Sequence, residues 1–321
     1  MAGVICAMLI GCLVLAGCAQ PAPDPAGPLT VRAAVLKGPT AMGLAGLIAD
    51  PGSYLGDSLT ASFAVEGTAD AISPKLLGGD LDIALLPSNL AAILHARSSG
   101  AVQVAAIDAL NVLYVVAKGV DIASIDDLAG RTVYSTGLGT TPQAVLEVVL
   151  AAHGLTGQVN VQYLSEATEV AAKLAAADSG IAVLPQPYVT VVTKRDPATR
   201  VAVDLGAEFQ AATGSPVVTG VTVVRRDFAA AHPEAVAAFL NASARSTAFT
   251  LASPVEAGQM IADLGIADAG VASAAIPYCG LTAVSGADVA EKLSGYLATL
   301  HDFKPELVGG ALPGDDFYWV G

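Results

Sequence analysis

The sequence has few charged residues, and their scarcity excludes two classes of partner. Only 14% of the 321 residues are charged, and acidic residues outnumber basic ones so far that the formal net charge is −14. Such a chain is not expected to bind nucleic acid, because the phosphate backbone is bound mainly by Lys and Arg. The same charge argues against electrostatic attraction to anionic lipid headgroups.

Histidine and cysteine are too few and too scattered to indicate a metal centre. The four histidines show no His-x-x-x-His spacing, and no two of the four cysteines form a Cys-x-x-Cys pair. The Gly-x-Ser-x-Gly motif of serine hydrolases is missing from the sequence too. We therefore expect no metal, no cofactor and no catalytic residue.

Long apolar runs are also lacking, and the one near the start has the features of a lipoprotein signal. Residues 4–16 are apolar but fewer than the roughly 20 needed to span a bilayer, and small residues precede Cys18. We expect residues 1–17 to be a signal peptide, Cys18 to be lipidated and the Pro-rich residues 18–28 to form a tether. A cleaved secretory signal without lipid is the alternative, and no Lys or Arg precedes the apolar run.

Disulfide bonds are not expected in the mature protein. Cys6 and Cys12 would leave with the signal and Cys18 would carry lipid, so Cys279 would be the only thiol left. The fold must then rest on its apolar core. With 54% hydrophobic residues and about 300 residues after the signal, the chain can form two compact domains.

Strand-like and helix-like segments alternate along the chain, which predicts an α/β fold with parallel strands. The first strand-like segment, residues 29–36, is followed by Lys37-Gly38-Pro39-Thr40 and then by apolar residues at helical spacing. This turn brings together a cation, a flexible glycine and unpaired N–H groups, which suits an anion. It is not a P-loop, and an incidental lysine in a buried turn is the alternative.

Three further turns follow strand-like segments or precede helical ones in a similar way. In one of them Thr141 suits the helix N-cap and Pro142 the first helical position. Ligands bind outside the carboxyl ends of the strands in open α/β sheets, so we expect the four turns to line one site. The three turns are residues 87–89, 137–142 and 185–188.

In this order the segments resemble the extracytoplasmic solute-binding proteins of ABC importers, in the group related to nitrate, sulfonate and taurine binding proteins. The resemblance covers nearly all of the mature chain and is also carried by residues 79–89, 127–134, 275–279 and 309–318.

The resemblance implies a type II periplasmic-binding-protein fold, an α/β fold in which two lobes joined by two hinge strands enclose a ligand cleft. Lobe 1 would comprise residues 29–111 plus 219–321, and lobe 2 residues 112–218. The crossings between the lobes would fall near residues 112–116 and 220–224.

Residues of both lobes would contact the ligand. We expect the site to contain Lys37, Gly38, Thr40, Met42, Ser88, Asn89, Gly139, Thr140, Thr141, Gln186 and Tyr188. Each has a structural alternative, because helix caps and core positions use the same residue types. Gln186 stands where relatives often carry an acidic residue, which bears on the preferred ligand charge.

The ligand itself stays open at this point. Lys37 and the helix N-termini favour an anion such as a sulfonate or nitrate, whereas the negative net charge favours a neutral molecule such as a small heterocycle.

The function implied by the resemblance is that of a lipid-anchored substrate-binding protein, not an enzyme. It would lie outside the cytoplasm as a monomer, capture a small solute by hinge closure and deliver it to the permease and ATPase of an ABC importer. One alternative is an enzyme on the same fold, of the thiamine-precursor or menaquinone-pathway type, although those enzymes work in the cytoplasm and the lipoprotein signal argues against them. Another is a ligand sensor that presents its closed form to a membrane receptor.

Overall fold

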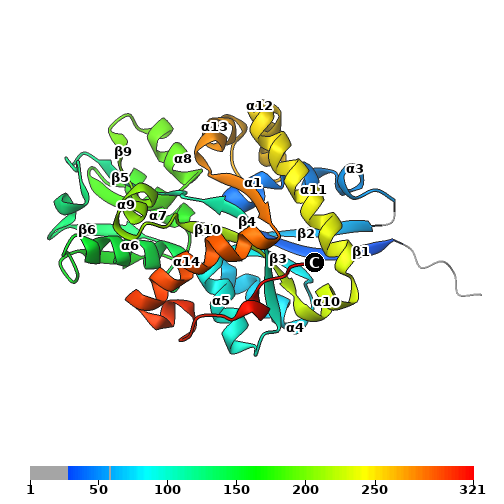
Figure 1. The fold of residues 1–321 in the computed structure, drawn as a ribbon. Helices are drawn as coiled ribbons and strands as arrows, with labels where there is room; N and C mark the ends of the chain where they lie inside the picture. Colours follow the sequence, from blue (N-terminus) through cyan, green and yellow to red (C-terminus); the bar gives the residue numbers. More distant parts are fainter. Residues whose placement is uncertain (1–27, 58) are drawn as a thin grey trace, which may run out of the picture.

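The computed structural model describes residues 28–57 and 59–321, which form two α/β lobes side by side (Figure 1). The first lobe is built around a six-stranded sheet of order β11-β4-β10-β3-β1-β2, and the second around a five-stranded sheet of order β7-β6-β8-β5-β9. The expected signal peptide, the lipidation site Cys18 and nearly all of the tether lie outside the described residues.

The sheet of the first lobe is mixed, although the sequence predicted parallel strands. Strand β1 runs parallel to β2 and β3, but β10 runs antiparallel to β3 and β4, because it returns from the second lobe in the opposite direction. The strands of this sheet are β1 (Leu29–Leu36), β2 (Leu59–Glu66), β3 (Ile83–Pro87), β4 (Val102–Leu110), β10 (Val218–Arg225) and β11 (Leu281–Ser285).

The sheet of the second lobe also combines parallel and antiparallel strands. Strand β6 is parallel to β7 and β8, and β5 is antiparallel to β8 and β9. Its strands are β5 (Leu113–Lys118), β6 (Thr132–Ser135), β7 (Asn160–Tyr163), β8 (Gly180–Pro185) and β9 (Thr199–Asp204). In both lobes, therefore, several parallel strands end at one edge, and the turns that follow them lie together there.

Helices cover both sheets. The apolar residues at helical spacing that follow Thr40 form two short helices, α1 and α2, which are separated at Leu44. None of the helices in the described ranges is long and apolar enough to span a bilayer. The helices are α1 (Pro39–Gly43), α2 (Ala45–Ala49), α3 (Pro51–Leu55), α4 (Ser73–Gly78), α5 (Ser88–Arg97), α6 (Thr141–Ala152), α7 (Ala167–Ala176), α8 (Tyr188–Arg195), α9 (Leu205–Thr213), α10 (Arg226–Ala231), α11 (Pro233–Ala252), α12 (Pro254–Asp263), α13 (Ala269–Ala275) and α14 (Ala287–Phe303).

Short 3₁₀ helices connect several of these elements. They are η1 (Ala69–Ala71), η2 (Ile125–Leu128), η3 (Ile276–Tyr278), η4 (Pro305–Val308) and η5 (Asp315–Phe317).

The chain crosses between the lobes twice, and hydrogen bonds tie the two crossings together. The first crossing lies between β4 and β5, and the second lies between α9 and β10. The Asn111 N–H donates to the Val217 carbonyl at 3.1 Å, and the Val217 N–H donates to Asn111 Oδ1 at 2.9 Å. Residues 113–116 and 220–224, near which the crossings were expected, pair within the second and the first sheet respectively, directly after each crossing.

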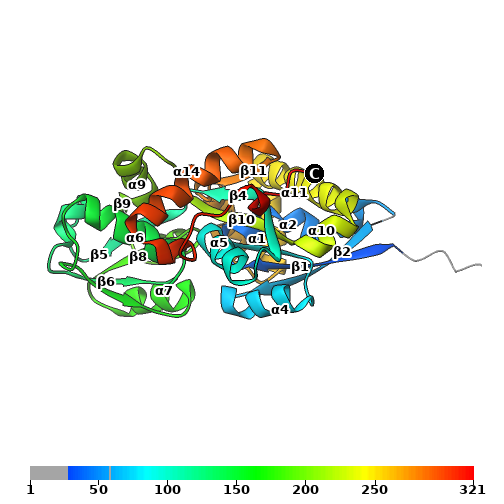
Figure 2. The ribbon, with the colours of Figure 1, turned by 60° about the horizontal axis from the view of Figure 1, so that its bottom comes forward.

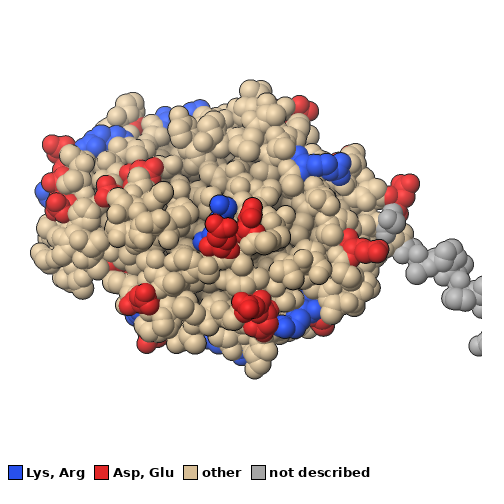
Figure 3. Space-filling view, in the orientation of Figure 1, with Lys and Arg blue, Asp and Glu red and all other residues tan. Residues whose placement is uncertain are grey.

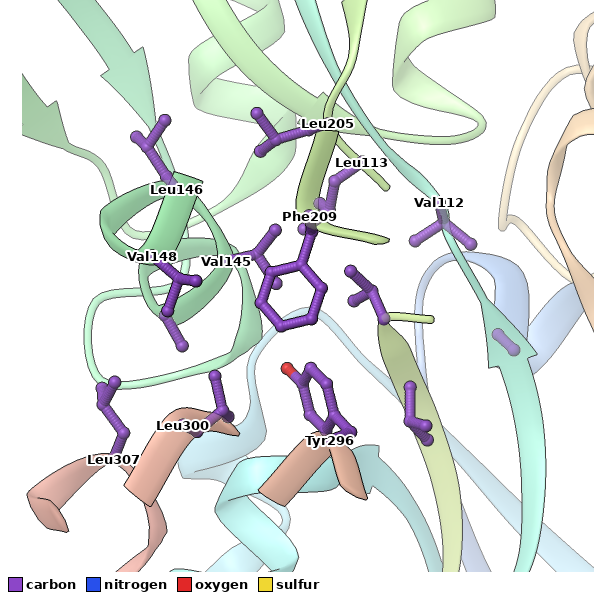
Figure 4. Packing of buried hydrophobic residues seen from close by; sticks show 14 of the residues in the cluster. Val112, Leu113, Val145, Leu146, Val148, Leu205, Phe209, Tyr296, Leu300 and Leu307 are labelled. Atoms are coloured by element: carbon purple, nitrogen blue, oxygen red, sulfur yellow. The ribbon is translucent and has the colours of Figure 1, made fainter. Parts of the chain in front are cut away.

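An apolar core joins the two lobes behind the crossings. One buried cluster contains residues of both sheets together with the inner face of α14. Both ribbon views place α14 at the junction of the lobes (Figures 1 and 2). Figure 4 shows the Phe209 ring of α9 facing the Tyr296 ring of α14, and their centroids are 5.6 Å apart. We call this part of the core, formed by α6, α9, α14 and η4, the rear seam.

Candidate functional site

A cavity of about 410 Å³ lies between the two lobes. Most of its walls are turns that follow the carboxyl ends of β1, β2 and β3 in the first lobe and of β6, β7 and β8 in the second. This is the place where a ligand is expected in an α/β fold with parallel strands. The segments that contribute most of the wall are residues 36–40, 67–70, 136–138, 140–142 and 164–167.

Six of the eleven expected residues lie on the cavity wall. The first lobe supplies Lys37, Gly38 and Thr40, and the second supplies Thr140, Thr141 and Tyr188. The turn after β1 is formed as the sequence indicated, with Pro39 opening α1. Gly38 takes a φ of 145°, which L side chains rarely adopt, so glycine is needed there for its backbone conformation.

The threonine hydroxyls on the wall are largely committed to the protein itself. Thr40 Oγ1 donates to the Leu36 carbonyl at 3.2 Å, and Thr140 Oγ1 donates to the Gly137 carbonyl at 2.9 Å. Thr141 Oγ1 donates to Asn89 Oδ1 at 3.2 Å. A hydroxyl that gives its proton to the protein can offer only lone pairs to a solute.

Met42, Ser88 and Gln186 were expected at the site but lie off the cavity wall. Met42 is fully buried in the core of the first lobe, where its sulfur lies 3.8 Å from Cys279 Sγ. The Ser88 hydroxyl donates to the Val218 carbonyl. Gln186 is buried and accepts a hydrogen bond from the Thr190 hydroxyl at 2.8 Å. These three side chains hold neighbouring segments in place behind the wall.

Asn89 and Gly139 also lie behind the wall, where they connect the lobes. The side-chain amide of Asn89, at the start of α5, donates to the Gly139 carbonyl at 3.2 Å and to the Leu307 carbonyl at 3.1 Å. Its Oδ1 accepts from Thr141, which opens α6 in the second lobe. Both polar atoms of the Asn89 side chain are thus hydrogen-bonded, to partners in the second lobe and in the C-terminal segment.

Several wall residues were not predicted from the sequence. Thr68 and Asp70 follow β2, while Ser165 and Glu166 follow β7. Because ligands bind outside the carboxyl ends of parallel strands, the turns after these two strands could also have been predicted to line the site. Thr219 lies near the start of β10 and carries no local sequence signal.

Tyr188 is the aromatic residue of the wall and opens α8. Burial raises the pKa of its phenol, and the nearby Glu166 carboxylate raises it further. The phenol therefore stays protonated at neutral pH and can donate a hydrogen bond into the cavity.

Charged side chains are sparse around the site. The wall carries one lysine, Lys37, and two carboxylates, Asp70 and Glu166. Most of the molecular face in Figure 3 is uncharged. Among the residues that the structure describes, no three His, Cys, Asp or Glu side chains are placed to hold a metal ion.

Comparisons with known proteins agree on the fold. A family model described as menaquinone biosynthesis matches residues 53–275. An ABC transporter protein from Parabacteroides distasonis has a TM-score of 0.76 and 23% identity, over 90% of this chain and 98% of that chain. The periplasmic aliphatic sulphonate binding protein of Escherichia coli has a TM-score of 0.72 and 16% identity, over 90% of this chain and 96% of that chain.

A more distant structure is the periplasmic nitrate-binding protein of Synechocystis, with a TM-score of 0.59 and 13% identity over 73% of this chain and 66% of that chain. No curated protein sequence matches the chain. At these identities the likeness shows the fold, and it confirms the predicted two-lobed periplasmic-binding-protein architecture.

Proposed function

The chain belongs to the family described as menaquinone biosynthesis, and from its cleft we propose that it acts as a substrate-binding protein of an ABC importer. The observation that carries the proposal is the cavity whose walls come from both lobes. A solute that contacts both lobes binds the closed arrangement more tightly than the open one, and so shifts the population toward closure.

The chemistry of the wall supports binding without reaction. Its described residues include neither histidine nor cysteine, and its hydroxyls from Thr40, Thr140 and Thr141 are held in hydrogen bonds to the protein. A nucleophile needs a base within hydrogen-bond reach, and none of these hydroxyls has one. Tyr188 and the apolar wall residues suit recognition of a small molecule.

The proposal includes a location and partners. The protein would be held outside the cytoplasm by a lipid on Cys18 and would meet the permease and ATPase of an importer as a monomer. Residues 29–111 plus 219–321 would move as one lobe and residues 112–218 as the other. Lys37, Gly38, Thr40, Thr140, Thr141 and Tyr188 would contact the solute directly.

A second candidate function is an enzyme of menaquinone biosynthesis. It is favoured by the family match over residues 53–275. The two functions differ in one measurable outcome, because a binding protein releases its solute unchanged and an enzyme converts it.

Native mass spectrometry of the purified protein, followed by thermal-shift assays with whatever solute it carries, tests the proposal. We expect the melting temperature to rise with solute concentration, because ligand binding stabilises the native state. Tyr188→Ala should reduce this rise, whereas Tyr278→Ala, at a position 60% exposed and away from the cavity wall, should not. Chemical conversion of the solute would favour the enzyme, and failure of any small solute to bind would exclude import.

A further inference from the structure

We propose that the cleft takes an uncharged solute with an apolar body and a hydrogen-bond acceptor, and that Thr219 is the residue that binds this acceptor. The inference rests on the proposed solute-binding function and specifies the class of solute.

The charges on the wall disfavour an anion. Lys37 contributes one positive charge while Asp70 and Glu166 contribute two negative ones, so the wall carries a net charge of −1. Proteins that bind planar oxyanions typically use the two-pronged donor geometry of arginine. Arginine is absent from the described residues of this wall. The single lysine is exposed and shares the cavity with two carboxylates.

The size and lining of the cavity indicate an apolar body. Its volume of about 410 Å³ lies in the range of sites that bind small organic molecules. A nitrate ion or a short sulfonate would leave most of that space unfilled. The wall includes Leu36, Leu86, Val112, Leu113 and Leu164, so an apolar solute would bury hydrophobic surface on binding.

A break in strand pairing gives Thr219 its special position. In the pairing of β10 with β4, Val218 is opposite Leu110 and Gly220 is opposite Ala109, so Thr219 is an extra residue without a partner. Such bulges redirect a side chain and occur often beside functional sites. Thr219 lines the cavity, and its hydroxyl oxygen is buried with no hydrogen-bond partner among the described residues.

The other threonine and serine hydroxyls of the wall are either paired or open to water. In addition to Thr40, Thr140 and Thr141, Thr136 donates to the Ser165 carbonyl at 3.4 Å. The half-buried Thr68 and the exposed Ser165 can be hydrated. Thr219 is thus the threonine of the wall with a buried and uncommitted hydroxyl, and the proposal requires a change of its χ1 rotamer that turns this hydroxyl toward the cavity that the residue already lines.

An unpaired buried hydroxyl destabilises the empty protein and strengthens the complex once an acceptor pairs with it. Thr219→Val removes the hydroxyl and keeps the shape, while Thr219→Ser keeps the hydroxyl. We expect Thr219→Val to raise the melting temperature of the empty protein while weakening solute binding about tenfold, and Thr219→Ser to bind within about threefold of wild type. Thr136→Val is the matched control, because it breaks an existing hydrogen bond and should lower the melting temperature.

The probes are benzamide and nicotinamide as uncharged carbonyl compounds, and nitrate and ethanesulfonate as anions, each measured by thermal shift and calorimetry. We expect an uncharged probe to bind, neither anion to bind, and Lys37→Ala to change the affinity of the uncharged probe less than about threefold.

Binding of an anion that Lys37→Ala abolishes would overturn the proposed class while leaving solute binding intact. A lower melting temperature in empty Thr219→Val, with unchanged probe affinity, would overturn the role of Thr219. If no probe of either kind binds and the purified protein carries no solute, the proposed function itself fails.

Discussion

The two lobes meet at the rear seam and at the cleft, and these two junctions differ in chemistry. At the rear seam, Phe209 and Tyr296 are fully buried, and Leu300 and Leu307 belong to the same buried cluster (Figure 4). At the cleft, the lobes present hydroxyls, a half-buried tyrosine and Leu138, which is 67% exposed. The rear seam therefore contributes stability without a ligand, whereas the cleft has surface left for a solute to bury.

This difference would let the fold stay stable while the cleft opens, as the proposed function requires. The buried aromatic pair joins α9 of the second lobe to α14, which also packs on β4, β10 and β11 of the first. Opening that separated these groups would expose large apolar surface, so hinge motion is expected to pivot near the rear seam and to change mainly the cleft.

The largest expected effect comes from breaking the rear seam. Phe209→Ala should lower the free energy of unfolding by about 3–5 kcal/mol, because it removes a fully buried ring and leaves a cavity beside Tyr296. Urea denaturation measures this loss. Leu138→Ala on the cleft side is the control and should stay within about 0.5 kcal/mol of wild type. Equal losses for the two variants would contradict the distinction between the junctions.

The second effect concerns a carboxyl group buried beside the cleft wall. Asp108 precedes Ala109 of the wall, and the Thr222 hydroxyl donates to its two oxygens at 3.0 and 2.9 Å. Burial raises the pKa of Asp108 to about 8, and the hydrogen bond from Thr222 offsets this only in part.

Because this raised pKa lies above the value of 3.8 for an unperturbed Asp, the folded protein holds a proton that the unfolded chain releases. The stability contributed by this proton is fully present below about pH 4 and is lost as the pH rises toward 8, by about 1.4 kcal/mol per pH unit. Asp108→Asn should flatten that decline by about 2–3 kcal/mol between pH 5 and 7 in urea denaturation. The exposed Asp80→Asn should leave it unchanged. An unaltered slope in Asp108→Asn would mean that the group is ionised in the fold.

The third effect tests the hydrogen bonds by which Asn89 links the two lobes. Asn89→Ala removes three hydrogen bonds and leaves the Gly139 and Leu307 carbonyls without their donor, which should cost about 1–3 kcal/mol in the free energy of unfolding. Because two of these bonds reach the second lobe, X-ray scattering of the solute-free protein should also show a wider opening. Asn160→Ala, which loses one exposed hydrogen bond to Thr132, should change neither measurement. A loss of stability with no change in opening would assign Asn89 to packing alone.

The sequence predicted the turns of the cleft because each has a local signal. Pro39 is the first residue of α1, and Pro142 is the second residue of α6, one position later than expected because Thr140 and not Thr141 is the N-cap. Such proline signals depend on neighbouring residues only. The direction of a side chain depends on packing that the sequence does not reveal locally. Met42 comes two residues after Thr40 on α1, and that spacing turns it from the cleft into the core.

Long-range contacts explain the remaining differences. Asn89 was expected to touch the ligand, but its amide is paired with Leu307, 218 residues further along the chain. Thr219 reaches the wall through a bulge that exists only because β10 pairs with β4. No pattern near either residue signals these contacts, since both depend on how distant segments meet.

The smallest expected effect is electrostatic and confined to the cleft. Burial is the larger cause of the raised pKa of Tyr188, and the Glu166 carboxylate is the smaller one. Glu166→Gln should therefore lower the pKa of Tyr188 only in part, leaving it above the usual value of about 10. NMR titration of ¹³C-labelled tyrosine measures this change, with Asp70→Asn as the control that leaves Tyr188 unaffected. A return of the pKa of Tyr188 to its usual value in Glu166→Gln would show that the carboxylate, and not burial, is the main cause of the shift. The cleft would then differ from the apolar rear seam more strongly than we propose.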